Sequence, residues 1–176
     1  KPLTPSHADE DDEEIASSPL DDNGKFYRRG SIIHKLLQYI CDVDIKNRKE
    51  ASLRFLERHL PDFTKTEINK IVDEVLMLCN EYSYIFSNNS MAEVPIVGEV
   101  DGKIISAKID RLVIAENTVT IVDFKTNRPS AKTINDVPKL YIKQMMLYRS
   151  LLQKLYPDKI IETYLLWTNT CNLMKI

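Results

Sequence analysis

Residues 109–125 read IDRLVIAENTVTIVDFK, two runs rich in Val and Ile on either side of Glu116-Asn117. Runs of β-branched residues around a two-residue polar turn predict an antiparallel hairpin. If Glu116 and Asn117 form the turn, paired residues have numbers that sum to 233, which sets Asp110 directly opposite Asp123. Both faces of the hairpin are mostly apolar, so we expect it to lie in the interior of a sheet.

The two aspartates need compensation, because carboxylates with Cβ atoms roughly 5 Å apart in an apolar setting repel each other. They can share a proton, or they can bind a hard divalent cation. Lys125 projects to the same strand face as Asp123, close enough to orient or deprotonate a metal-bound water. Spacing alone gives equal support to a buried ion pair between Asp123 and Lys125, with Asp110 solvated.

Helical periodicity governs most of the chain before the hairpin. Three helices are predicted there, over residues 33–41, over residues 48–60, and from the capping-box pattern Thr64-x-x-Glu67 onward. After the hairpin, a long helix is predicted from Asn135 or Asp136 to about Leu155, with Pro138 in its first turn. These helices provide the layers that a central sheet requires.

Strand patterns fill the middle and the end of the chain. Predicted strands over residues 93–100, 103–114 and 119–125 form an antiparallel meander, and a last strand is predicted over residues 162–168. Helices, meander, helix and strand in this order predict an α/β fold, a mixed central sheet flanked by helices.

The long helix carries two polar residues within an apolar stripe. Gln144 and Tyr148 are i, i+4 neighbours, so they lie on one face of the helix. By themselves they are more typical of a tyrosine packed in the core with a glutamine at its rim. Their meaning therefore depends on the motifs around them.

Composition excludes several classes of protein. The 176 residues, 43% hydrophobic and 28% charged, are typical of one soluble globular domain and not of a low-complexity or disordered chain. No apolar run approaches the roughly 18 residues of a membrane span, so we expect no membrane partner and a cytoplasmic location. Cys41, Cys79 and Cys171 lack a metal-binding spacing and are expected to be buried free thiols.

Charge is distributed unevenly along the chain. Residues 1–22 hold eight of the 26 acidic residues and one of the 24 basic residues, so the remainder carries +5 although the whole chain carries −2. Residues 1–24 are therefore predicted to be an acidic flexible linker and residues 25–176 the folded domain. Because the chain also lacks an initial Met, we expect it to be a fragment of a longer protein.

The motifs, taken in order, resemble a known family. Ile109-Asp110-Arg111, the run from Ile121 to Pro129 and Gln144-x-x-x-Tyr148 resemble the RecB-type branch of the PD-(D/E)xK nuclease superfamily, which has a restriction-endonuclease-like core. The similarity extends to other segments that resemble the C-terminal nuclease domain of the AddA subunits of bacterial AddAB helicase-nucleases, namely residues 29–37, 92–98 and 165–168. It covers the chain from about Phe26 to the end.

The resemblance implies a metal site. The implied ligands are His34, Asp110 and Asp123, and the backbone carbonyl of Phe124 is implied to complete the shell. The implied cofactor is Mg²⁺, for which Mn²⁺ can substitute in vitro. In many superfamily members the first helix carries an acidic residue, whereas here it carries His34, as is usual in the RecB-type branch.

The resemblance also implies the reaction. Lys125 is implied to be the catalytic lysine beside Asp110 and Asp123, while Gln144 and Tyr148 are implied to support the site and the DNA. The implied activity is an Mg²⁺-dependent DNA exonuclease that processes double-strand breaks for recombinational repair. Its implied partners are single-stranded DNA, the AddA helicase domains that deliver the strand, and the AddB subunit.

Two alternatives remain from the sequence. A net charge of +5 predicts that the domain alone binds DNA weakly, as expected for a nuclease that is fed by a motor. An inactive docking module with a nuclease fold is the first alternative, and its sign would be a broken Asp–Asp–Lys set. Here Asp110, Asp123 and Lys125 are all present. A stand-alone nuclease of the same fold is the second alternative.

Overall fold

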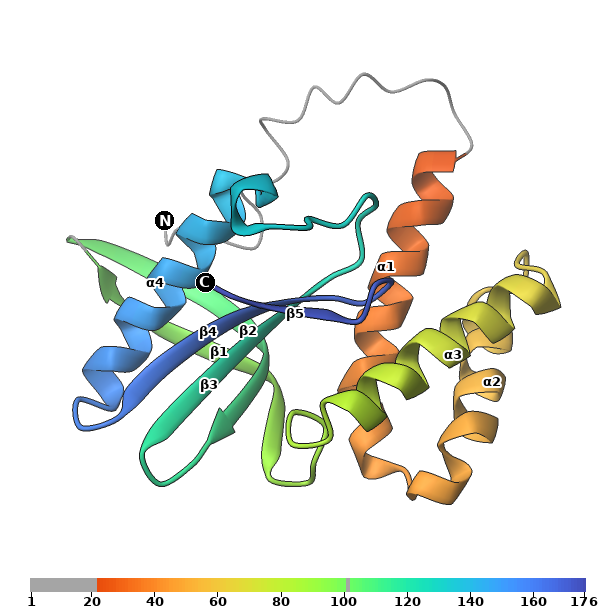
Figure 1. Cartoon of the computed structure of the whole chain (residues 1–176), viewed down its shortest axis with the longest axis horizontal. Coiled ribbons are helices and arrows are strands. Elements are labelled where there is room, and N and C mark those ends of the chain that lie inside the picture. The colour runs from red at the N-terminus through yellow and green to blue at the C-terminus, as the bar shows by residue number, and fades with distance from the viewer. Residues whose placement is uncertain (1–21, 101) are drawn as a thin grey trace.

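The computed structural model describes residues 22–100 and 102–176. Its helices are α1 (Asp22–Tyr39), α2 (Arg48–His59), α3 (Lys65–Glu81) and α4 (Lys139–Leu155), with short 3-10 turns at Ile40–Asp42, Ile45–Asn47 and Ile134–Asp136. Its strands are β1 (Ser90–Val100), β2 (Lys103–Ile114), β3 (Thr118–Lys125), β4 (Ile160–Trp167) and β5 (Asn172–Lys175). In Figure 1, α4 lies on one side of the sheet and α1, α2 and α3 lie on the other.

The sheet is mixed, as predicted. Its strand order is β1-β2-β3-β4-β5, and the first three strands form the antiparallel meander. β4 pairs parallel to β3 because α4 crosses over between them, and β5 returns antiparallel to β4. The predicted α/β class, a mixed sheet flanked by helices, is confirmed.

Some boundaries differ from the sequence prediction. α1 begins at Asp22, so residues 22–24 of the predicted linker are helical, and the rest of that linker lies outside the described residues. α4 begins only at Lys139, because Asp136 accepts hydrogen bonds from the backbone and hydroxyl of Thr133 and closes a separate 3-10 turn. The short strand β5 was not predicted.

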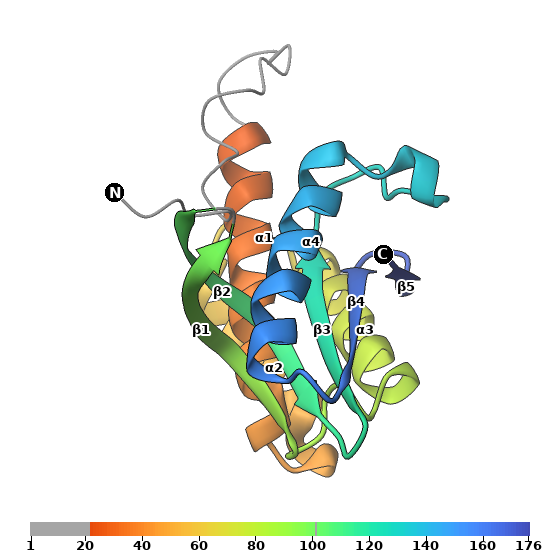
Figure 2. The same ribbon diagram turned by 90° about the vertical axis from the view of Figure 1, so that its left-hand side faces the viewer.

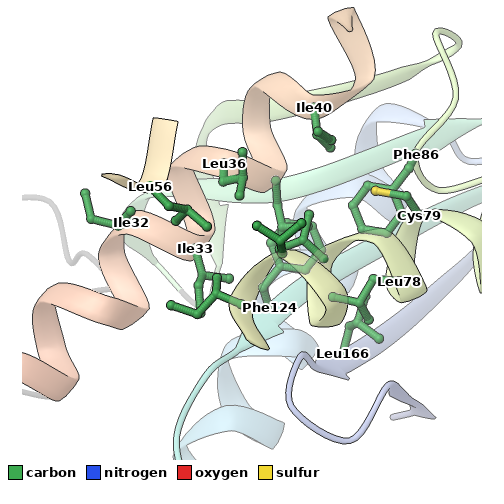
Figure 3. Close-up of a cluster of buried hydrophobic side chains, with 14 of the residues drawn as sticks. Ile32, Ile33, Leu36, Ile40, Leu56, Leu78, Cys79, Phe86, Phe124 and Leu166 are labelled. Atoms are coloured by element: carbon green, nitrogen blue, oxygen red, sulfur yellow. The ribbon is translucent and has the colours of Figure 1, made fainter. Parts of the chain in front are cut away.

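Both faces of the central strands are buried, which confirms the predicted interior hairpin. On one face, Val122, Phe124 and Leu166 pack against apolar side chains of α1, α2 and α3 (Figure 3), among them Ile33, Leu36, Leu56, Leu78 and Cys79. On the other face, Ile121 and Leu165 belong to a second cluster that includes α4 residues Met145, Tyr148, Leu151 and Leu152. Burial on both faces fixes the register of β3 and therefore the positions of Asp123 and Lys125.

The cysteines and the membrane prediction can be checked against the described residues. Cys41 and Cys79 are buried free thiols, as predicted. Cys171 is also a free thiol, but it lies in the turn between β4 and β5 and is only partly buried. Within residues 22–100 and 102–176, no helix is both long and apolar enough to cross a bilayer.

Arg111 fastens the end of α1 to the sheet. Its side chain is 1% exposed, and Nη2 donates a hydrogen bond to the carbonyl of Leu37. Leu37 lies in the last turn of α1, where carbonyls lack intrahelical partners. Nη1 donates to Ser90 Oγ at 3.3 Å, and the guanidinium lies over the Phe86 ring. This anchor holds α1, and with it His34, against β2.

Gly30 allows α1 to approach the end of β3. A Cβ atom at Gly30 would lie 2.6 Å from Thr126 Oγ1, closer than side chains tolerate. We expect Gly30→Ala to lower the free energy of unfolding by about 1 kcal/mol, because overpacking outweighs the gain in helix propensity. Urea denaturation measures this.

Two companion variants test the cause. Gly24, also in α1, has nothing within 4 Å of the corresponding position, so Gly24→Ala is expected to leave stability unchanged or raise it slightly. Thr126→Ala removes the close oxygen, so adding Gly30→Ala to it should no longer destabilise. Equal losses with and without the threonine oxygen would contradict the close approach.

Candidate active site

The β2–β3 pairing ends where the predicted site begins. Paired residues follow the predicted register from Ile114–Val119 to Arg111–Val122. Continued by two residues on each strand, this register would pair Ile109 with Phe124, and the N–H of Phe124 would donate to the carbonyl of Ile109. Instead, Phe124 N–H donates to Asp110 Oδ2 at 2.7 Å.

The predicted direct backbone pairing of Asp110 with Asp123 is therefore wrong. The physical reason is that the Asp110 carboxylate competes successfully for the N–H that the ladder would have used. The two carboxylates remain neighbours across the open end of the hairpin, since the charge of Asp110 contributes to the raised pKa of Asp123. The backbone pairing of β2 with β3 thus ends at Arg111–Val122, and a polar site follows at the end of β3.

His34 reaches this site from α1. Its Nδ1 lies 3.6 Å from Asp110 Oδ2, and its ring contacts the Phe124 ring edge to face, with centroids 5.8 Å apart. Burial alone would lower the pKa of His34, but the Asp110 carboxylate outweighs it and raises that pKa. The structure thus brings His34 to Asp110, as the resemblance implied.

Lys125 forms a buried ion pair with Asp123. Lys125 Nζ lies 2.8 Å from Asp123 Oδ2, and the two side chains are 12% and 6% exposed. This is the ion pair that the spacing left open as an alternative. That alternative also required a solvated Asp110. Its side chain is instead only 14% exposed and contacts Phe124 and His34.

α4 holds the Lys125 ammonium in place. Lys125 Nζ donates to Gln144 Oε1 at 3.2 Å, and Gln144 Nε2 in turn donates to the hydroxyl of Tyr148 at 2.9 Å. The Tyr148 hydroxyl donates to the carbonyl of Lys108 on β2 at 3.2 Å. The Q-x-x-x-Y pair is therefore part of the site, where it links the lysine to the neighbouring strand.

Tyr141 is a site residue that the sequence analysis missed. Lys125 Nζ lies 3.7 Å from the centroid of its ring, within the range of a cation–π contact. Its position gave a signal, since Tyr141, Gln144 and Tyr148 are spaced i, i+3 and i+7 on α4 and so share one helix face.

The two carboxylates differ in their ionisation. Burial, together with the nearby Asp110, raises the pKa of Asp123 in spite of the Lys125 charge. Burial also opposes ionisation of Asp110, but His34 and the N–H of Phe124 prevail and lower its pKa. Burial alone would lower the pKa of Lys125, yet Asp123 raises it, so the amine is present as ammonium.

The donor set suits a hard divalent cation. Carboxylate oxygens are the ligands that Mg²⁺ prefers, and one imidazole adds compatibility with Mn²⁺. In this conformation, however, residues 22–100 and 102–176 contain no group of three or more His, Cys, Asp and Glu side chains arranged to hold a metal. Asp123 contributes one oxygen, Oδ2, to the ion pair with Lys125. The role of the Phe124 carbonyl stays a prediction.

The chain has a mixed five-stranded sheet with helices on both faces, and the sheet carries the Asp–Asp–Lys set. This combination defines the restriction-endonuclease-like class of folds. Within that class, the chain belongs to the PD-(D/E)XK nuclease superfamily, whose family model matches residues 11–170. Membership supports nuclease activity. Among curated proteins, none matches the chain.

Solved structures include two similar chains. One is the crystal structure named "Putative exonuclease" from Eubacterium rectale, which is 15% identical with a TM-score of 0.46. The match covers 80% of this chain and 58% of that one. The other, SSO0001, is 13% identical with a TM-score of 0.36, and the match covers 84% of this chain and 63% of that one. The present chain thus spans less than two thirds of either.

Tyr148→Phe tests the support from α4. The variant loses the hydroxyl that accepts from Gln144 and donates to the Lys108 carbonyl, so we expect a loss of about 1 kcal/mol in unfolding free energy. Because Gln144 then orients Lys125 less firmly, kcat for DNA cleavage should fall by roughly tenfold. Tyr156→Phe, at the other end of α4, is the control for both measurements. A Tyr148→Phe protein with parental kcat would exclude the orienting role.

Proposed function

We propose that this chain is a metal-dependent deoxyribonuclease domain. The observation that carries the proposal is the ion pair of Lys125 with Asp123 beside Asp110, at the end of a strand buried on both faces. Buried ionisable groups with opposed pKa shifts are concentrated at catalytic sites. Asp110, Asp123 and His34 would hold the cation, which supplies Lewis-acid stabilisation of the charge that develops on the scissile phosphate.

The side chains of this site then have separate tasks. The Lys125 ammonium is held by Asp123, by Gln144 and by the face of Tyr141. From there it can donate a hydrogen bond to the attacking water or to a phosphate oxygen. Buried side chains of Phe124 and α4 adjoin the site, and a less polar setting strengthens these interactions.

We also propose that the domain acts on single strands delivered by a helicase motor in double-strand-break processing. The support is the resemblance of residues 29–37, 92–98 and 165–168 to the AddA nuclease domain. The AddA helicase domains and the AddB subunit would then be its partners. A charge of only +5 outside residues 1–22 agrees with delivery by a tethered motor, where effective concentration replaces affinity.

Degradation of end-labelled single-stranded DNA tests the proposed activity. We expect cleavage with Mg²⁺ or Mn²⁺, none in EDTA, and none with Ca²⁺ alone.

If the chain alone does not cleave, cation binding should be measured by calorimetry on the parent and on Asp110→Asn. Binding that is lost in the variant would support a nuclease that requires its motor. Equal weak binding by both proteins would favour the docking module.

A further inference from the structure

The first turns of α1 expose two adjacent aromatic side chains. Tyr27 is 83% exposed and Phe26 is 62% exposed, and Tyr27 is the most exposed of the large apolar residues that the structure describes. Single exposed apolar residues are ordinary, but neighbouring exposed aromatics are typical of binding surfaces. Phe26 and Tyr27 are called the aromatic pair below.

The aromatic pair lies on the approach to the active site. Tyr27 and His34 are seven residues apart on α1, nearly two helical turns, so they share a face and lie about 10 Å apart along the helix axis. Figures 1 and 2 show that this end of α1 projects beyond the ends of β3 and β4. A chain-like ligand that occupies the site can therefore continue over the aromatic pair.

Cationic side chains lie beside Phe26 of the aromatic pair. A cavity of about 240 Å³ between α1 and α3 is bordered by Phe26, Arg29 and Arg128. The Arg29 and Arg128 guanidiniums share a single carboxylate, that of Glu74, at 2.6 and 2.8 Å. Arg128 follows Lys125 by three residues, so this cationic pair adjoins the catalytic strand.

The surroundings carry an excess of positive charge. The cavity is lined by four cationic residues and two acidic ones, namely Lys25, Arg29, Lys70 and Arg128 against Glu67 and Glu74. Two positive charges therefore remain uncompensated locally. An anionic ligand with flat apolar groups complements both the charge and the aromatic pair.

We propose that the aromatic pair and the adjoining guanidiniums form a contact surface for single-stranded DNA on its way to the active site. Bases stack on Phe26 and Tyr27, and phosphates contact Arg128, whose side chain is 46% exposed, while Arg29, 11% exposed, holds Glu74 beside it. Stacking requires unpaired bases, so this surface selects single strands over duplex. The inference rests on the proposed function and adds to it the residues that hold the strand outside the site.

Fluorescence anisotropy with labelled oligothymidylate in EDTA tests the surface without cleavage. We expect Phe26→Ala and Tyr27→Ala in the 176-residue chain each to weaken binding about fivefold or more, the lower end of base–aromatic stacking. Tyr39→Ala is the matched control, because Tyr39 is an exposed aromatic at the other end of the same helix. Parental affinity in both α1 variants would overturn the proposal and leave the aromatic pair as a protein-docking surface.

Two further ligands identify the forces. An abasic oligonucleotide offers phosphates without bases, so parent and Tyr27→Ala should bind it equally. A fivefold difference on the abasic strand would overturn stacking as the cause. Arg128→Ala is expected to reduce the slope of log Kd against log salt concentration by the amount that corresponds to about one phosphate contact. An unchanged slope would remove Arg128 from the surface.

A small substrate separates this proposal from the proposed function. Bis(p-nitrophenyl) phosphate reaches the active site but does not extend to Tyr27. With Mn²⁺, we expect the Phe26→Ala/Tyr27→Ala protein to hydrolyse it at the parental rate while KM for oligothymidylate rises. Failure of the parent on both substrates, together with cation binding that does not depend on Asp110, would refute the proposed function alone, since DNA binding in EDTA is measured independently. Parental KM on oligothymidylate in the double variant would refute the DNA surface alone.

Discussion

Lys125→Met is expected to abolish metal-dependent DNA cleavage, with kcat lower by at least about 10³-fold. The variant keeps most of the length of the side chain, but it loses the ammonium that contacts Asp123, Gln144 and the Tyr141 ring. The site thereby loses the group that is proposed to hold the attacking water beside the phosphate. Degradation of end-labelled single strands in Mn²⁺ measures the loss.

The same variant should also be less stable. Removing one partner of a buried ion pair leaves the other charge uncompensated, which costs on the order of 3 kcal/mol. In Lys125→Met the uncompensated group is Asp123, which already lies near the Asp110 carboxylate. Lys175→Met is the matched control, because it removes an exposed ion pair with Glu162 and should cost less than about 1 kcal/mol.

A double variant shows whether electrostatics is the cause. Asp123→Asn removes the charge that Lys125→Met leaves unpaired, so adding it should restore most of the lost unfolding free energy while the protein stays inactive. Urea denaturation of both single variants and the double variant, in EDTA, gives the coupling energy. Additive losses would mean that Lys125 and Asp123 stabilise the fold independently of their ion pair.

The hairpin shows how much of the fold the sequence specified. The two-residue turn at Glu116-Asn117 and the alternation of apolar residues determined the register, and the structure has that register from Ile114–Val119 to Arg111–Val122. Local turn chemistry and burial on both faces act together there, so pattern and structure agree. The meander and the flanking helices followed from the same kind of local information.

The site itself depended on information that is not local. No pattern within the hairpin indicates that the Asp110 side chain replaces a backbone partner of Phe124, because that choice depends on His34 from α1 and on the buried setting. The burial of Arg111 likewise requires a helix end that is remote in sequence, at Leu37. Motif resemblance located the residues, whereas their contacts required the tertiary structure.

The polar end of the hairpin also explains why α1 is fixed so firmly. Arg111 and Asp110 are consecutive on β2 and point to opposite faces, and both reach α1, one at Leu37 and the other at His34. Gly30 brings the same helix onto Thr126 just beyond the end of β3. Three contacts of different chemistry therefore set the distance between the histidine and the carboxylates.

Two substitutions of Asp110 separate its structural role from its chemical one. Asp110→Asn and Asp110→Ala are both expected to reduce cleavage by at least about 10³-fold, because both remove the charge that would hold the cation. Asp110→Asn keeps a side-chain oxygen that can accept the N–H of Phe124, so its unfolding free energy in EDTA should stay within about 1 kcal/mol of the parent.

Asp110→Ala leaves that N–H without its acceptor beside a buried ring, and we expect a loss of roughly 1–3 kcal/mol. Relief of the repulsion between Asp110 and Asp123 acts in the opposite direction in both variants, so it cancels when the two are compared. The difference in unfolding free energy between the alanine and asparagine variants therefore reports the contacts of the side-chain amide, of which the hydrogen bond from Phe124 is the shortest. Equal stabilities would show that the end of β3 does not depend on this bond, and measurable cleavage by either variant would remove Asp110 from the catalytic set.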